Sequence, residues 1–186
     1  MKLIPEWLPH AYCCVAWPCN KDLYGDFIYD AQIEIANLVN EISSDEKILL
    51  FCNSRDMVEC KKIVSNTNIY FIDVPLDDSW MRDIAPIFLR NFNQLESISF
   101  EFNGYGKYPN FSNDNKISNF ISDRLNIKYL KSNIVLEGGA ITYDEEGNLF
   151  TTESVLLNKN RNNHLSKIQF EDELIRLLGV NKVIWL

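Results

Sequence analysis

The chain has 186 residues, of which 46% are apolar and 24% are charged, and its net charge is −8. This length and composition are typical of one globular domain with a sizeable core. A nucleic-acid-binding protein normally carries a basic face, and a transmembrane helix needs about 20 consecutive apolar residues. The sequence has neither, so we expect no nucleic-acid and no membrane partner. The acidic balance suits a cationic substrate, although solubility explains it equally well.

Cysteine and histidine usage indicates a reducing compartment and no metal. The five cysteines are odd in number, and no pair has the spacing of a zinc site. The two histidines, His10 and His164, both fall in expected loops. The first residues do not resemble a signal peptide. We therefore expect a cytoplasmic protein with reduced cysteines, no metal and no cofactor.

The first part of the chain alternates between strand and helix patterns. Apolar residues at steps of three and four, such as Phe27, Ala31 and Ile35, predict an amphipathic helix. Ser54 is expected to cap a second helix. Short apolar runs, two of them followed by proline, predict strands between these helices. We expect strands at residues 13–17, 47–52 and 68–74, and helices at residues 27–42 and 54–64.

The second part predicts two hairpins, two helices and two further strands. Ser166 and Gln169 have the spacing of a capping box, and Gly179 ends the helix that they begin. No Pro-, Ser- or Gly-rich linker divides the chain, so we expect one α/β domain over residues 1–186. The expected strands are 86–89, 97–102, 134–137, 141–143, 149–152 and 181–186, and the expected helices are 116–125 and a last helix ending at residue 179.

Polar residues cluster directly after the strand expected at residues 68–74. The segment is Asp77-Asp78-Ser79-Trp80-Met81-Arg82-Asp83. A carboxylate accepts two parallel hydrogen bonds from a guanidinium, and an indole face attracts a cation. Trp80 and Asp83 therefore suggest a cradle for a guanidinium or amine, with Arg82 neutralising Asp77 or Asp78. An acidic surface turn with a local Asp–Arg pair explains the same residues about as well.

A second carboxylate stands at another expected strand end. Glu137 follows a short apolar run and precedes Gly138 and Gly139, which allow close approach of a backbone or a ligand. Taken alone, a Gly-Gly turn with an incidental Glu is the simpler interpretation. The polar loops at 151–153 and 158–162 are interpreted as solvated connections, and the cysteines at 13, 14 and 52 as inert thiols in apolar surroundings.

Taken together in chain order, these motifs carry a family resemblance. Residues 77–83 with Ile84-Ala85-Pro86 resemble the Asp-Asp-Ser-Trp-Met-Arg-Asp-x-Gly-Pro signature of agmatine deiminases and Porphyromonas-type peptidyl-arginine deiminases. The likeness covers essentially the whole chain. The further matching segments are Glu6-Trp7-Leu8-Pro9-His10, Ala16-Trp17-Pro18, Leu136-Glu137-Gly138-Gly139, residues 151–161, Leu165-Ser166-Lys167, Leu178-Gly179-Val180 and residues 183–186.

The resemblance implies a pentein fold, an α/β-propeller of ββαβ-type units that modifies guanidino groups. It also implies hydrolysis of a guanidine, agmatine giving N-carbamoylputrescine and ammonia on the route to putrescine, through a covalent cysteine intermediate. By this resemblance Asp83 and Glu137 are catalytic and bind the substrate, and Trp80 packs beside its stem. The expected partner is a small cationic guanidine.

The sequence departs from the family pattern in ways that bear on activity. The family's catalytic histidine, second aspartate and nucleophilic cysteine follow the segment that matches residues 183–186, and Tyr105 replaces the usual Trp. We therefore expect an N-terminal half with an incomplete ring, inactive alone, that associates with itself or with a C-terminal half. Residues 183–186 and the strand before Asp77 are the expected exposed surfaces.

Three functional hypotheses remain open. The first is an agmatine deiminase, the second a protein-arginine deiminase relative, and the third a non-catalytic remnant or binding module. The intact Asp/Trp motif and the absence of a signal peptide favour the first over the second.

Overall fold

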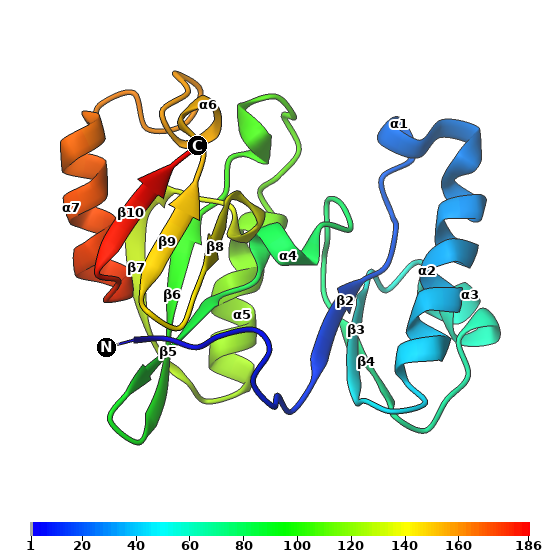
Figure 1. Cartoon of the computed structure of the whole chain (residues 1–186). Helices are drawn as coiled ribbons and strands as arrows, with labels where there is room; N and C mark the ends of the chain where they lie inside the picture. Colours follow the sequence, from blue (N-terminus) through cyan, green and yellow to red (C-terminus); the bar gives the residue numbers. More distant parts are fainter. Residues whose placement is uncertain (1) are drawn as a thin grey trace. The chain divides into compact units, whose positions relative to one another are not determined.

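The computed structural model describes residues 2–186, whose ten strands form three separate sheets (Figure 1). The chain folds as two units. One comprises residues 9–81, and the other comprises residues 82–186 together with the N-terminal segment up to Leu8. No helix in residues 2–186 is both long enough and apolar enough to cross a lipid bilayer.

The 9–81 unit is a three-stranded parallel sheet with two crossover helices. The strands β2 (Cys13–Ala16), β3 (Ile48–Cys52) and β4 (Ile69–Asp73) lie in the order β2-β3-β4. The helices α2 (Ile28–Ile42) and α3 (Met57–Ile63) connect them and pack on the same side of the sheet (Figure 1). All five residues of the central strand β3 are buried, as its continuous apolar run predicts.

The other unit contains two copies of a ββαβ arrangement. In the first, β5 (Ile87–Asn91) and β6 (Gln94–Glu101) form a hairpin, and α5 (Ile117–Arg124) leads to β7 (Lys128–Val135), which lies parallel to β6. The short strand β1 (Lys2–Leu3) adds to the free edge of β5.

The second copy repeats this order. The strands β8 (Ile141–Tyr143) and β9 (Asn148–Thr151) are antiparallel, and α7 (Lys167–Leu178) leads to β10 (Lys182–Trp185), parallel to β9. One apolar core joins both sheets to α7, with Phe170 and Leu174 fully buried in it. The remaining helical turns are α1 (Lys21–Tyr24), α4 (Met81–Ile84), α6 (Glu153–Leu156) and the 3-10 turns Gly25–Phe27, Gly104–Gly106, Asp114–Lys116 and Gly138–Ala140.

Most predicted elements are confirmed, with corrected limits. The capping box at the start of α7 is present, and Gly179 ends the helix in the left-handed conformation with φ of 66°. The helix expected from Ser54 begins at Met57, because the Ser54 hydroxyl donates to Asp73 Oδ1 (2.6 Å). The strand expected at residues 134–137 is the end of the longer β7.

The expected exposure of residues 183–186 is partly wrong. Val183 is buried in the core of its unit, whereas Leu186 is exposed. The strands β10 and β4 nevertheless each lie at the end of their sheet, so within the described residues each has one strand neighbour.

Candidate functional site

Asp83 is held by a donor on each of its carboxylate oxygens. It lies in the single helical turn α4, directly before β5. The backbone N–H of Gly139 donates to Oδ1 (2.9 Å), and the hydroxyl of Tyr105 donates to Oδ2 (2.7 Å). Both donors are neutral, and each occupies one acceptor position on its oxygen.

The Gly-Gly pair is required by this packing. A Cβ on Gly139 would overlap Asp83 Oδ1, and a Cβ on Gly138 would overlap the backbone carbonyl of Arg82. Only glycine allows the turn after β7 to approach α4 so closely. The sequence prediction that these glycines permit a close approach is confirmed, and what approaches is the Asp83 turn.

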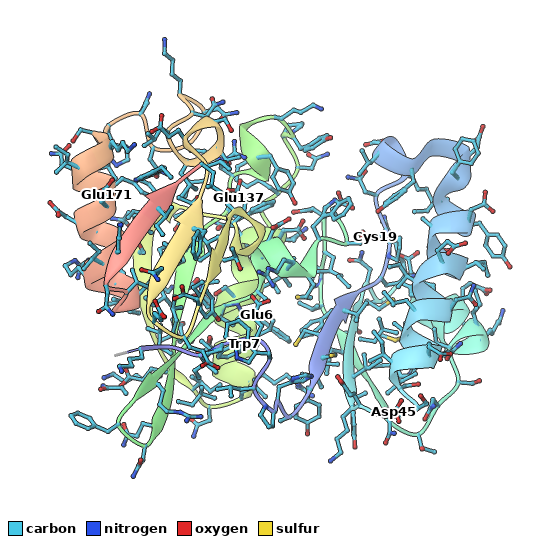
Figure 2. The ribbon with its side chains drawn as sticks, viewed as in Figure 1. Glu6, Trp7, Cys19, Asp45, Glu137 and Glu171 are labelled. Carbon is cyan, nitrogen blue, oxygen red and sulfur yellow. The ribbon has the colours of Figure 1, made fainter. Side chains whose placement is uncertain are left out.

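Glu137 forms a buried ion pair that the sequence did not predict. It lies between the end of β7 and the turn Gly138–Ala140 (Figure 2) and is 3% exposed. Arg161 Nε donates to its Oε1 (2.7 Å), and the Arg161 side chain is only 9% exposed. The other carboxylate oxygen, Oε2, is buried and has no hydrogen-bond partner among the described residues.

Tyr105 connects the two carboxylates. Its hydroxyl donates to Asp83, while its backbone carbonyl accepts from Arg161 Nη1 and from Asn160 Nδ2 (3.1 Å). The residue has φ of 61°, and Gly104 and Gly106 on either side have φ of 63°. This left-handed turn directs the ring and the carbonyl of Tyr105 to different partners. Asp83 and Glu137 therefore belong to one hydrogen-bond network.

Trp80, the third predicted site residue, belongs to the 9–81 unit. It is 49% exposed, and its indole Nε1 donates to Asp78 Oδ2 (2.9 Å). The Ser79 N–H donates to Asp78 Oδ1 (2.8 Å). Burial raises the pKa of the Asp78 carboxyl, against the opposing effect of these hydrogen bonds. Asp78 thus orients the indole ring.

Two interpretations from the sequence need correction. The loop 158–162, interpreted as a solvated connection, is exposed at residues 158–160 but not at its end. There the Arg161 side chain is 9% exposed, and the buried Asn162 side chain accepts from Val135 N–H (2.9 Å) and donates to the Val135 carbonyl (2.8 Å). Arg82, expected to neutralise Asp77 or Asp78, forms an ion pair with Glu6 (2.6 Å). A buried glutamate needs a cationic partner, so predicting the burial of Glu137 would have led to a search for a residue such as Arg161.

The N-terminal segment is held against the rest of its unit by side-chain contacts. Glu6 and Trp7 belong to this segment (Figure 2), and Trp7 Nε1 donates to Glu145 Oε1 (3.1 Å) in the β8–β9 turn. The Tyr143 hydroxyl donates to the Ile4 carbonyl, and burial raises the pKa of Tyr143 to about 12. The segment is therefore anchored by side chains as well as by β1.

None of the five cysteines, all of which the structure describes, forms a disulfide. Cys19, Cys52 and Cys60 are buried. The sequence interpretation of Cys13 was incomplete, because it packs against apolar residues but its sulfur also contacts Glu46 Oε2 (2.9 Å) and His10 Nε2 (3.5 Å). Burial and the hydrogen bond to Glu46 raise the pKa of the Cys13 thiol to about 12.

Comparisons with known proteins agree on one family. The family model described as Porphyromonas-type peptidyl-arginine deiminase matches residues 2–186. An agmatine deiminase of Medicago truncatula is 36% identical over 195 residues, covering 97% of this chain and 52% of that protein. An agmatine deiminase of Stutzerimonas stutzeri is 31% identical over 188 residues, covering 97% of this chain and 51% of that protein. The chain thus spans about half the length of these curated relatives.

Solved structures give the same result. An agmatine deiminase of Enterococcus faecalis has a TM-score of 0.94 at 26% identity, covering 100% of this chain and 52% of that one. A C. jejuni agmatine deiminase with substrate bound has a TM-score of 0.90 at 29% identity, covering 100% and 55%. The expected fold class is confirmed: an α/β pentein fold with several sheets and no closed barrel, matching about half of each neighbour.

Proposed function

Because this chain belongs to the Porphyromonas-type peptidyl-arginine deiminase family, we propose that Asp83 and Glu137 bind the guanidinium of a small cationic substrate of the agmatine type. The reaction that this binding serves is hydrolysis of the guanidine to a ureido group and ammonia. Agmatine deiminases among the relatives and solved neighbours support agmatine over a peptidyl arginine.

The observation that carries the proposal is the unpartnered Oε2 of Glu137. Buried polar atoms nearly always have hydrogen-bond partners, and an exception calls for an explanation. Arg161 already occupies Oε1, which fixes the orientation of the carboxylate. A substrate N–H at Oε2 would remove the cost of an unsatisfied buried acceptor.

Asp83 is suited to a second contact with the same cation. Tyr105 and Gly139 each use one acceptor position, which leaves one lone pair on each oxygen. The two carboxylates together balance the charges of Arg161 and of one substrate cation, and a planar guanidinium presents five N–H donors to them. Trp80, exposed and held by Asp78, is proposed to pack against the aliphatic stem of the substrate.

These residues bind and orient the cation but do not attack it. Deimination needs a nucleophile at the guanidinium carbon, and the family resemblance assigns that role to none of Cys13, Cys14, Cys19, Cys52 and Cys60. We therefore propose that residues 1–186 provide the carboxylate wall of a site whose nucleophile comes from elsewhere.

Binding is tested by NMR titration of the 186-residue chain with agmatine. We expect a Kd in the millimolar range, about −4 kcal/mol, because residues 1–186 are proposed to provide only one wall of the site. Asp83→Asn and Glu137→Gln should each weaken binding, and Glu34→Gln, the same change at an exposed position of α2, should not. Equal affinity in all four proteins would refute the proposal.

Substrate class is tested in the same titration. We expect agmatine to bind more tightly than a blocked arginine peptide of matched length. The reverse order would favour a protein-arginine deiminase relative. Absence of any guanidine binding, with the fold intact by circular dichroism, would favour a non-catalytic remnant.

A further inference from the structure

Three side chains with different metal-binding chemistry meet in the 9–81 unit, and the proposed deiminase chemistry uses none of them. Glu46 Oε2 lies 2.8 Å from His10 Nε2 and 2.9 Å from Cys13 Sγ, and the nitrogen and sulfur are 3.5 Å apart. In the described residues this is the one group of three His, Cys, Asp or Glu ligand atoms within 4.8 Å of one another.

The sheet register brings these residues together. β2 and β3 are parallel, with Cys13 opposite Ile48, and the Cys13 N–H donates to the Lys47 carbonyl (2.8 Å). This pairing places the segment before β2, with His10, next to the α2–β3 connection, with Glu46. The contact is therefore fixed by backbone hydrogen bonds as well as by its own side chains.

The cluster is accessible from solvent. The side chains of His10 and Glu46 are 45% and 44% exposed. They line a hollow of about 400 Å³ together with Ala11, Tyr12, Asp45 and Lys47. Asp45 lies in the α2–β3 connection (Figure 2) and lines the same hollow, so a second carboxylate belongs to its wall. An ion can enter here without disturbing the core.

The donor set fits zinc. Zinc is bound by thiolate, imidazole and carboxylate at about 2.3, 2.0–2.1 and 2.0–2.2 Å, which puts ligand atoms in a tetrahedral shell roughly 3.3–3.6 Å apart. The S–N distance already lies in this range, and the other two need to lengthen by roughly 0.5–0.7 Å. A thiolate and a carboxylate together balance the charge of a divalent ion. Mg²⁺ and Ca²⁺ prefer shells made entirely of oxygen ligands.

We propose that His10, Cys13 and Glu46 bind one zinc-class divalent cation, with water or Asp45 at the fourth position. On binding, the S–H bond of Cys13 breaks, its proton goes to solvent, and the sulfur electron pair forms the bond to the metal. No electrons are transferred. The bound ion would join the segment before β2 to the connection before β3, and so secure an edge strand of the parallel sheet.

The test uses the 186-residue chain, prepared metal-free with reductant, and Zn²⁺ as the probe. Competition with a chromophoric chelator should give one site per chain, with release of a proton. Co²⁺ in place of Zn²⁺ should give a thiolate-to-metal charge-transfer band. Loss of a ligand should weaken binding by more than the roughly 10–100-fold that loss of an outer-shell partner costs. Mg²⁺ should not compete.

Matched variants locate the site. Cys13→Ala and His10→Ala should abolish tight binding and the Co²⁺ band, whereas Cys14→Ala, the adjacent cysteine outside the cluster, should retain both. Zn²⁺ should raise the thermal midpoint of the wild type and of Cys14→Ala but not of Cys13→Ala. Should Cys13→Ala fail to fold, Glu46→Gln provides an isosteric substitute. The proposal is overturned by equal zinc affinity across these variants, or by wild type that binds no zinc.

Discussion

Replacing Arg161 by Met should strongly destabilise the unit that contains Asp83 and Glu137. The change keeps most of the aliphatic stem and removes the guanidinium. It leaves the Glu137 charge 3% exposed and without a partner on either oxygen among the described residues. Breaking a buried ion pair by removing one partner costs about 3–5 kcal/mol.

The variant also removes the hydrogen bond from Arg161 to the Tyr105 carbonyl, which adds little to this cost. That carbonyl also accepts from Asn160 Nδ2, so it keeps a donor in the variant. A change of about 3–5 kcal/mol corresponds to a fall in Tm of roughly 6–20 °C for a chain of this length. The measurement is urea unfolding by circular dichroism, with a thermal melt of the same samples.

The control is an exposed pair of the same composition. Arg176 donates to Glu173 (Nε to Oε2, 2.7 Å), and its side chain is 61% exposed. Arg176→Met should therefore cost only about 0–1 kcal/mol. The double variant Glu137→Gln/Arg161→Met should be less destabilised than the two single changes added together, because it removes both charges. Equal costs for Arg161→Met and Arg176→Met, or strict additivity, would refute the reasoning.

Four further predictions concern other parts of the chain. Gly139→Ala places a methyl group on Asp83 Oδ1 and should weaken agmatine binding roughly 10–100-fold by NMR titration; unchanged affinity would contradict the role of Asp83. Hydrogen bonds from the Asn148 side chain and backbone lower the pKa of the Asp144 carboxyl, so its stabilising effect is present at neutral pH and is lost as pH falls through the folded-state value. Asp144→Asn should reduce this loss of stability at acid pH, measured from unfolding curves at several pH values. An unchanged dependence of stability on pH would argue against it. The 186-residue chain should release no ammonia from agmatine, with or without Cys19→Ala; turnover that disappears in Cys19→Ala would identify an unforeseen nucleophile. Because β4 and β10 end their sheets, sedimentation should show concentration-dependent association, and a monomer at every concentration would count against it.

Sequence patterns predicted the longer helices and strands better than the short ones. The three- and four-residue apolar spacing of α2 and the Ser166–Gln169 box of α7 are local signals, and both helices formed as expected. Residues 128–133 of β7 were missed because Lys128, Lys131 and Ser132 interrupt any apolar run, although the paired backbone needs no apolar side chains there. One-turn helices such as α6 carry too few residues for a periodic signal.

The residues of the candidate site also differ in how far local patterns predict them. Glu137 was singled out by a local pattern, a strand end followed by two glycines, and only the family resemblance assigned it a role. Its partner Arg161 lies 24 residues later, in a loop whose asparagines resemble a solvated connection. The low exposure of Arg161 and Asn162 at the end of that loop depends on the long-range contacts of Asn162 with β7, and no local pattern encodes them.

The hydrogen bonds at the phenol and at the carbonyl of Tyr105 couple the positions of Asp83 and Glu137. Its phenol donates to Asp83, and its carbonyl accepts from Arg161, which donates to Glu137, so the supports of both carboxylates meet at one residue. The separation between those supports is then set by the dimensions of a single tyrosine, and displacements of the two carboxylates should be correlated. Shortening or enlarging the residue at position 105 should therefore shift the two carboxylates relative to each other, and with them the cation that the pair is proposed to bind.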